Sequence, residues 1–98
     1  MIKPLYTASI ANGGQYVYRF PNNYGASVVK HEFSYGYYDD MWEVAVIKFL
    51  DSSNTNWIID YSTPLTKDVI GWVKWIDTYE ILRDIMKLPP HKLLELAD

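Results

Sequence analysis

Cysteine is absent from this chain, so disulfides, thiolate chemistry and cysteine-based zinc sites are excluded. Positive charge is scarce: the net charge is −3, whereas a duplex-binding protein is expected to show a basic footprint. The same charge balance disfavours binding to an anionic membrane surface. No apolar run reaches the roughly 18 residues of a spanning helix, and the first residues lack the features of a signal peptide. These absences predict a cytoplasmic protein that binds neither a duplex nor a membrane.

Groups suited to catalysis or metal binding are also few. Of the two histidines, His31 falls in an expected strand, where a structural role is commoner than a catalytic one, and His91 follows two prolines. Asp39 and Asp40 are adjacent in an expected loop, without the ligand spacing of a calcium site. No phosphate-binding loop or nucleophile elbow occurs. The sequence therefore predicts no enzyme, no metal site and no cofactor.

Apolar and aromatic residues, in contrast, are plentiful. Hydrophobic residues make up 49% of the chain and aromatic residues 16%, with nine tyrosines and four tryptophans. This supply of apolar surface disfavours disorder, because its burial can offset the conformational entropy lost on folding. A chain of 98 residues has room for one modest core. Residues 1–98 are therefore expected to form a single domain.

The centre of the chain predicts two strands joined by a loop. Residues 26–33 alternate, which would place Val29, His31 and Phe33 on a mostly apolar face. Residues 42–50 are apolar on both faces, as in a central strand that is covered on both sides. Gly36 and the two aspartates before Met41 favour a loop between them.

The flanking segments predict further strands. Residues 15–20 alternate aromatic residues with Val17 and Arg19, after a strong turn signal at residues 12–14. The first 14 residues are expected either to be irregular or to pair with this strand across that turn. Residues 57–61 predict a short edge strand that ends before Pro64. Residues 68–73 fit a helical turn or a short strand.

The C-terminal part predicts a helix over residues 78–88. Asp77 and Glu80 have the spacing of a capping box, and two isoleucines stand at the staple positions. Trp72 and Trp75, three residues apart, are expected on one helical face. Two prolines end the helix, and residues 89–98 are expected to form a short helix or a frayed tail. The predicted fold is α+β: a mostly antiparallel sheet of three to five strands, with the C-terminal helix packed on one face.

Tyrosines in the expected loops give the best functional lead. Tyrosine offers a large rigid contact area at a small entropic cost, and neighbouring Asp, Ser and Gly add adaptable hydrogen bonds. The alternative is that these rings pack around the rim of a thin core. The predicted binding residues are Tyr24, Tyr35, Tyr37, Tyr38 and Asp39.

Several blocks resemble, in order, a family of small uncharacterised proteins encoded by tailed bacteriophages. The blocks are residues 21–29 (PNNYGASVV), 31–36 (HEFSYG), 42–46 (WEVAV) and 61–71 (YSTPLTKDVIG). The resemblance spans about residues 21–88. It implies a phage origin and a place in the cytoplasm of an infected bacterium. It implies no activity and no functional residues.

Three function classes remain open at this stage. The first is a non-enzymatic module that binds a host or phage protein through the aromatic loop. The second is a self-associating structural protein, a homo-oligomer formed through the edge strand at residues 57–61. The third binds single-stranded nucleic acid by stacking bases on Tyr16 and Tyr18 beside Arg19; the lysines, however, are scattered singly along the chain.

Overall fold

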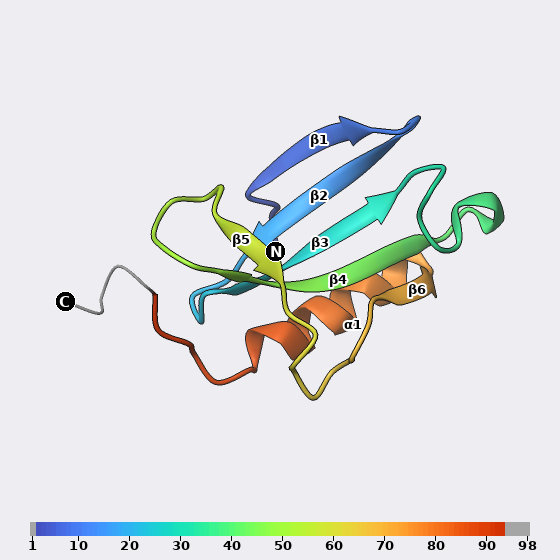
Figure 1. Cartoon of the computed structure of the whole chain (residues 1–98). Helices are drawn as coiled ribbons and strands as arrows, with labels where there is room; N and C mark the ends of the chain where they lie inside the picture. The colour runs from blue at the N-terminus through green and yellow to red at the C-terminus, as the bar shows by residue number, and fades with distance from the viewer. Residues whose placement is uncertain (1, 94–98) are drawn as a thin grey trace.

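Residues 2–93, which a computed structural model describes, form one antiparallel sheet with a helix across one face (Figure 1). The strands are β1 (Tyr6–Ile10), β2 (Gly13–Arg19), β3 (Tyr24–Lys30), β4 (Trp42–Phe49), β5 (Trp57–Ile59) and β6 (Ile70–Val73). The helix is α1 (Trp75–Met86). The sheet order is β1-β2-β3-β4-β5, and β6 also pairs with β4. The α+β fold predicted from the sequence, with its C-terminal helix on the sheet, is confirmed, and β6 makes the sheet six-stranded.

The first hairpin begins at Tyr6, so the first 14 residues are not irregular throughout. β1 pairs with β2 from Tyr6 opposite Val17 to Ile10 opposite Gly13. The two turn residues, Ala11 and Asn12, have φ of 45° and 63°, as the type I′ turn of a two-residue hairpin requires. Of the two alternatives for the first 14 residues, pairing across the turn is therefore correct from Tyr6 onward.

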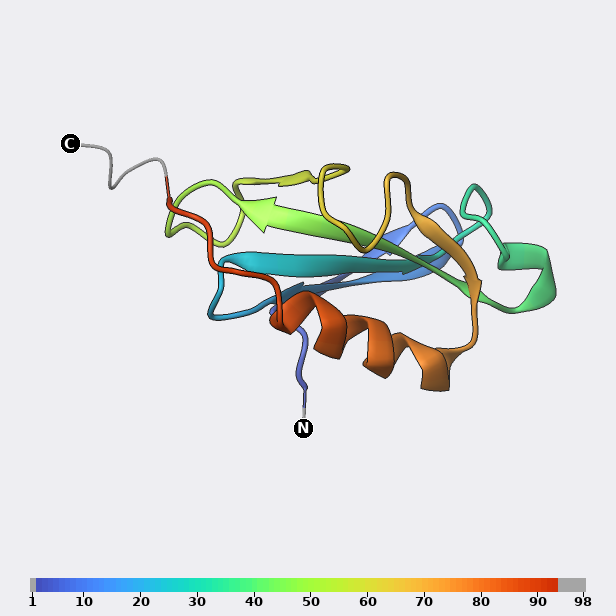
Figure 2. The same ribbon diagram turned by 90° about the horizontal axis from the view of Figure 1, so that it is seen from below.

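β4 is the central strand and is covered on both faces, as predicted for residues 42–50. On one face Val44 and Val46 pack under α1, and on the other Ile47 and Phe49 form a second, smaller cluster with Val17. Figure 2 shows α1 lying along the first of these faces. The buried residues of the α1 face are Tyr18, Phe20, Ala26, Val28, Val44, Val46, Val73, Leu82, Ile85 and Leu88.

The second face is covered by side chains from both edges of the sheet. Trp57 of β5 donates a hydrogen bond from Nε1 to the Tyr6 hydroxyl of β1 at 2.8 Å. The guanidinium of Arg19 lies 4.3 Å from the centre of the Phe49 ring. Arg19 also donates to the backbone oxygens of Asp51 and Ser53, at 3.1 and 3.0 Å. The sheet therefore curls around this cluster, with Arg19 fastening the β4–β5 loop to it.

The prediction that His31 and Phe33 continue the strand is wrong. β3 ends at Lys30, where the backbone N–H of His31 donates to Ser34 Oγ and the N–H of Ser34 donates to the His31 oxygen. This tight turn replaces the strand pairing that the alternation predicted beyond Lys30. Phe33 is consequently 79% exposed rather than part of the core.

The helix begins earlier than the capping box at Asp77 indicated. The N-cap residue is Lys74, with extended φ and ψ, and its side chain makes no capping hydrogen bond. The backbone N–H of Asp77 donates to the Lys74 oxygen, so Asp77 is already inside the first turn, where its charge suits the helix dipole. Packing of Trp75 against Tyr16 places the start of the helix and overrides the local signal.

The C-terminal segment is tied to the β2–β3 turn by Asn22. The buried amide of Asn22 donates to the backbone oxygens of Ile85 and Leu88, at 2.8 and 3.1 Å. Ile85 lies in the last turn of α1, where carbonyl groups lack the usual partner four residues on, and its oxygen also accepts a bond from the Leu88 N–H at 3.1 Å. Residues 89–93 form no helix, and the rest of the expected short helix or tail, residues 94–98, lies outside the described residues.

Candidate functional site

The loop of residues 31–41 between β3 and β4 lies beside β6, at one end of the sheet (Figures 1 and 2). The N–H of Trp72 approaches the Tyr35 oxygen at 3.5 Å. Two glycines permit this close approach. A Cβ at Gly71 would lie 2.7 Å from Tyr35 Cβ, and one at Gly36, where φ is 96°, would lie 3.0 Å from Trp72 Cα. The loop is therefore docked on β6 at a defined position.

Four side chains form what we term the aromatic surface: Tyr35, Tyr38, Asp39 and Trp72. Tyr35 and Trp72 stack with ring centres 5.4 Å apart, and Trp72 Nε1 donates to Asp39 Oδ2 at 3.2 Å. Tyr38 belongs to the same short 3₁₀ turn as Asp39. Tyr35 is 53% exposed, Tyr38 88% and Trp72 57%. The stacked pair of Tyr35 and Trp72 is thus presented to solvent together with the ring of Tyr38, which contacts Tyr37.

Trp72 has an unusual backbone conformation. Its φ is 52°, in the left-handed region that bulky residues rarely occupy and that costs on the order of 1–3 kcal/mol. The expectation that Trp72 and Trp75 share one helical face is wrong, because Trp72 lies in β6 and only Trp75 lies in α1. Trp75 packs inward against Trp42 at 4.8 Å, whereas Trp72 points outward to stack on Tyr35. Strain of this kind concentrates at sites that bind or switch.

Sequence reasoning found three of the four members of the aromatic surface. It predicted Tyr35, Tyr38 and Asp39 as binding residues and missed Trp72. The fourth predicted member of the loop, Tyr37, is half-buried and packs edge-on against Tyr38 at 5.1 Å. The one feature of the sequence that pointed to Trp72 was the neighbouring Gly71, since a glycine in a strand often marks a close backbone approach.

The charges around the aromatic surface are mainly negative. Asp39 accepts the Trp72 hydrogen bond, and Glu43 Oε1 accepts one from the Tyr35 N–H at 3.0 Å. Asp40 pairs with Lys30. The surroundings of the aromatic surface therefore suit a partner group that is neutral or positively charged.

Tyr24, the fifth predicted site residue, lies elsewhere. It begins β3, whereas the loop of the aromatic surface follows the end of that strand (Figure 1). Its ring meets the imidazole of His91 edge-on, with centres 4.8 Å apart. Burial, with a contribution from the charge of Asp60, raises the pKa of Tyr24. Tyr24 thus helps to hold the C-terminal segment and is not part of the aromatic surface.

Asp60 is a buried carboxylate just after β5. Its Oδ1 accepts hydrogen bonds from the Ser62 N–H and Oγ, at 2.8 and 2.5 Å. Burial alone would raise the pKa of Asp60. The bonds from Ser62 and the charges of Lys48 and His91 outweigh burial and hold this pKa below the ordinary 3.8.

This lowered pKa predicts a stability that depends on pH. A carboxyl group whose pKa is lower in the folded state stabilises the fold above its unfolded pKa, and this contribution is lost as the pH falls through the folded pKa. Between about pH 6 and pH 3, we expect the unfolding free energy of the wild type to fall further than that of Asp60→Asn. Urea titrations at several pH values measure both. Parallel curves for the two proteins would contradict the assignment.

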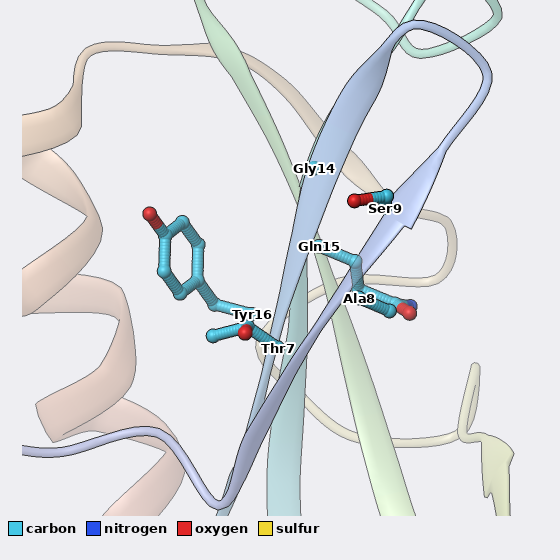
Figure 3. A pocket seen from close by; sticks show the side chains of 6 residues that line it. All are labelled: Thr7, Ala8, Ser9, Gly14, Gln15 and Tyr16. Atoms are coloured by element: carbon cyan, nitrogen blue, oxygen red, sulfur yellow. The ribbon is translucent and has the colours of Figure 1, made fainter.

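Two hollows lie away from the aromatic surface. One, of about 290 Å³, lies on the β1–β2 hairpin and is lined by Thr7, Ala8, Ser9, Gly14, Gln15 and Tyr16. In Figure 3 the Tyr16 ring points toward α1 and the Gln15 side chain points to the opposite side of the hairpin. The other, of about 610 Å³, is lined by Ile2, Tyr79, Arg83 and Met86. Neither hollow brings together an acid, a base and a nucleophile.

Within residues 2–93, no three His, Asp or Glu side chains gather closely enough to hold a metal ion. Over the same described residues, no helix is long and apolar enough to cross a membrane.

The residues considered for base stacking are not available on one open face. Tyr18 is buried under α1, and Tyr16 packs against both Trp42 and Trp75, with ring centres 5.7 and 5.4 Å away. Arg19 lies against Phe49 on the other side of the sheet.

No family model matches the chain, and no curated protein and no solved structure matches it either. The resemblance to the phage proteins therefore stays a hypothesis.

Proposed function

We propose that this protein is a non-enzymatic module that binds another protein through the aromatic surface. The observation that carries the proposal is Trp72, a half-exposed tryptophan in a left-handed backbone conformation, stacked on Tyr35 and bonded to Asp39. Exposed, preorganised Trp and Tyr side chains are the residues that dominate the binding energy of protein interfaces. Their rigidity lowers the entropic cost of association.

The chemistry of the surface favours a protein over a nucleic acid. Phosphate groups would meet the carboxylates of Asp39 and Glu43, whereas stacking sites for single strands combine aromatic rings with positive charge. A basic side chain of a partner could instead stack on Trp72 beside Asp39. The resemblance to phage proteins adds the proposal that the partner is a protein of the infected bacterium or of the phage.

Truncation of the aromatic surface tests this function. The variant is Tyr38→Ala combined with Trp72→Asn, since asparagine tolerates the left-handed conformation while the indole ring and its hydrogen bond to Asp39 are removed. We expect at least about 30-fold weaker retention of the partner from a bacterial lysate, because removal of such a hot spot costs about 2 kcal/mol or more. The measurement is affinity capture on immobilised protein, with the captured partner then titrated by calorimetry.

Tyr61→Ala is the matched control, because Tyr61 is 51% exposed and follows β5, outside the aromatic surface. The control should retain the partner fully, and both variants should unfold at temperatures close to that of the wild type. Equal retention by the wild type and the double variant would overturn the proposal. A double variant that unfolds at a much lower temperature would show that these rings act as core.

A further inference from the structure

Strand β1 offers an unprotected sheet edge. Within residues 2–93, β1 pairs only with β2, and Figure 1 shows no element beyond it. Proteins commonly protect an edge strand by making it very short or by placing charges, proline or a bulge on it. β1 is five residues long and contains no charge and no proline. Strand β5, at the other edge, is only three residues long.

The charge pattern allows two copies of β1 to meet. The chain has a net charge of −3, so two copies repel each other overall. No charged residue occurs between Lys3 and Arg19, however, so β1 and the β2 residues that pair with it carry no charge. Two copies that approach through β1 bring no like charges together at the paired residues.

The register of the hairpin makes the β1 edge self-complementary. Ile10 and Gly13 flank a two-residue turn and form a hydrogen-bonded pair, so Ile10, Ala8 and Tyr6 direct their backbone groups toward β2. Thr7 and Ser9 direct theirs outward. A two-fold axis at Ala8 would place Thr7 of one copy opposite Ser9 of the other. Both residues then offer backbone N–H and C=O groups to each other, as a hydrogen-bonded pair requires.

The side chains suit the same register on both faces of the sheet. Thr7 stands beside Tyr16 on the α1 face, so the hydroxyls of Thr7 and Ser9 would meet across the axis. On the other face the exposed Ile10 would meet Tyr6. Hydroxyl pairs and aromatic–aliphatic pairs are both favourable across antiparallel strands.

We propose that a second copy of this chain adds to the sheet at the β1 edge, antiparallel and centred on Ala8. The two sheets become one continuous sheet across the axis. The aromatic surface belongs to the opposite, β4–β6 side of the sheet and remains open in this dimer. A dimer would thus present two aromatic surfaces and bind a multivalent partner with increased avidity.

Disulfide trapping tests the register directly, because the chain has no cysteine of its own. Across the axis, the two Ala8 residues form a non-hydrogen-bonded pair with Cα atoms about 4.5 Å apart, within the span of a disulfide. We expect Ala8→Cys to form a covalent dimer at least about tenfold faster than Thr7→Cys or Ile58→Cys. Thr7→Cys lies on the same edge but out of register, and Ile58→Cys lies on the β5 edge. Non-reducing gels over an oxidation time course give the rates.

Sedimentation of the unmodified chain supplies the second readout. We expect a concentration-dependent shift from 11.5 kDa to twice that mass, and its loss in Ala8→Lys, which sets two like charges opposite each other. Ile58→Lys is the control and should still dimerise. A wild type that stays monomeric at all concentrations, equal trapping of the three cysteine variants, or loss of the dimer in Ile58→Lys alone would each overturn the proposal.

Discussion

Phe49→Ala is expected to lower the free energy of unfolding by about 3–5 kcal/mol, the usual cost of truncating a buried phenylalanine. Phe49 is fully buried and forms the smaller cluster of the sheet with Val17 and Ile47. Its ring also lies under the guanidinium of Arg19, which fastens the β4–β5 loop. Truncation therefore leaves a cavity and removes the surface on which Arg19 rests. Urea denaturation followed by circular dichroism measures the loss.

Phe33→Ala is the matched control for this prediction, since it makes the same chemical change at a residue that is 79% exposed. We expect its unfolding free energy to stay within about 0.5 kcal/mol of the wild type, as for most surface substitutions. The sequence pattern had placed Phe33 on the apolar face of a strand. A large loss in Phe33→Ala would support that pattern and contradict the turn at His31.

Gly25→Ala is expected to destabilise the protein by about 3 kcal/mol, at the upper end of the usual cost of overpacking. A Cβ at Gly25 would lie 1.9 Å from the backbone oxygen of Tyr18 on the neighbouring strand. The obstacle is backbone, so no side-chain rotation relieves it and β3 must move away from β2. That shift breaks ladder pairing in the centre of the sheet, where Gly25 stands opposite Arg19 and Ile47.

Gly14→Ala isolates the steric effect. Gly14 also lies in a strand of the same sheet, but its added Cβ would have only the Ala8 oxygen nearby, at an ordinary contact distance of 3.8 Å. We expect a change within about 0.5 kcal/mol, possible in either direction because alanine also restricts the unfolded chain. Thermal unfolding of both variants decides the matter. Similar losses in the two would show that the close approach at Gly25 is not what makes its substitution costly.

Sequence patterns predicted the structure correctly where the neighbouring residues of the chain supported the same prediction. The run at residues 42–50 is apolar on both faces, and β4 is covered on both faces. The turn at Asn12 lies between two segments that pair, so the first hairpin formed as one of the two expected alternatives. Both features depend on contacts close in sequence or on simple periodicity.

Patterns failed where a specific contact, distant in sequence in one case and local in the other, outweighed the predicted pattern. Asp77 has a capping signature, yet packing of Trp75 against Tyr16 starts the helix two residues before it. The alternation through Phe33 fits a strand, yet the hydrogen bonds between His31 and Ser34 close a turn. Propensities of this kind are worth a fraction of a kcal/mol per residue, which tertiary contacts readily exceed.

The sequence by itself determined the fold class, the central strand and most of the exposed tyrosine loop, because these depend on the alternation and composition of contiguous residues. Only the tertiary structure decided that Trp72 joins Tyr35 and Asp39 and that Tyr24 does not. Trp72 is more than 30 positions from both partners, and no periodicity links such residues. Their meeting depends on β6 pairing with β4, and on two glycines that allow backbone and side chain to approach closely.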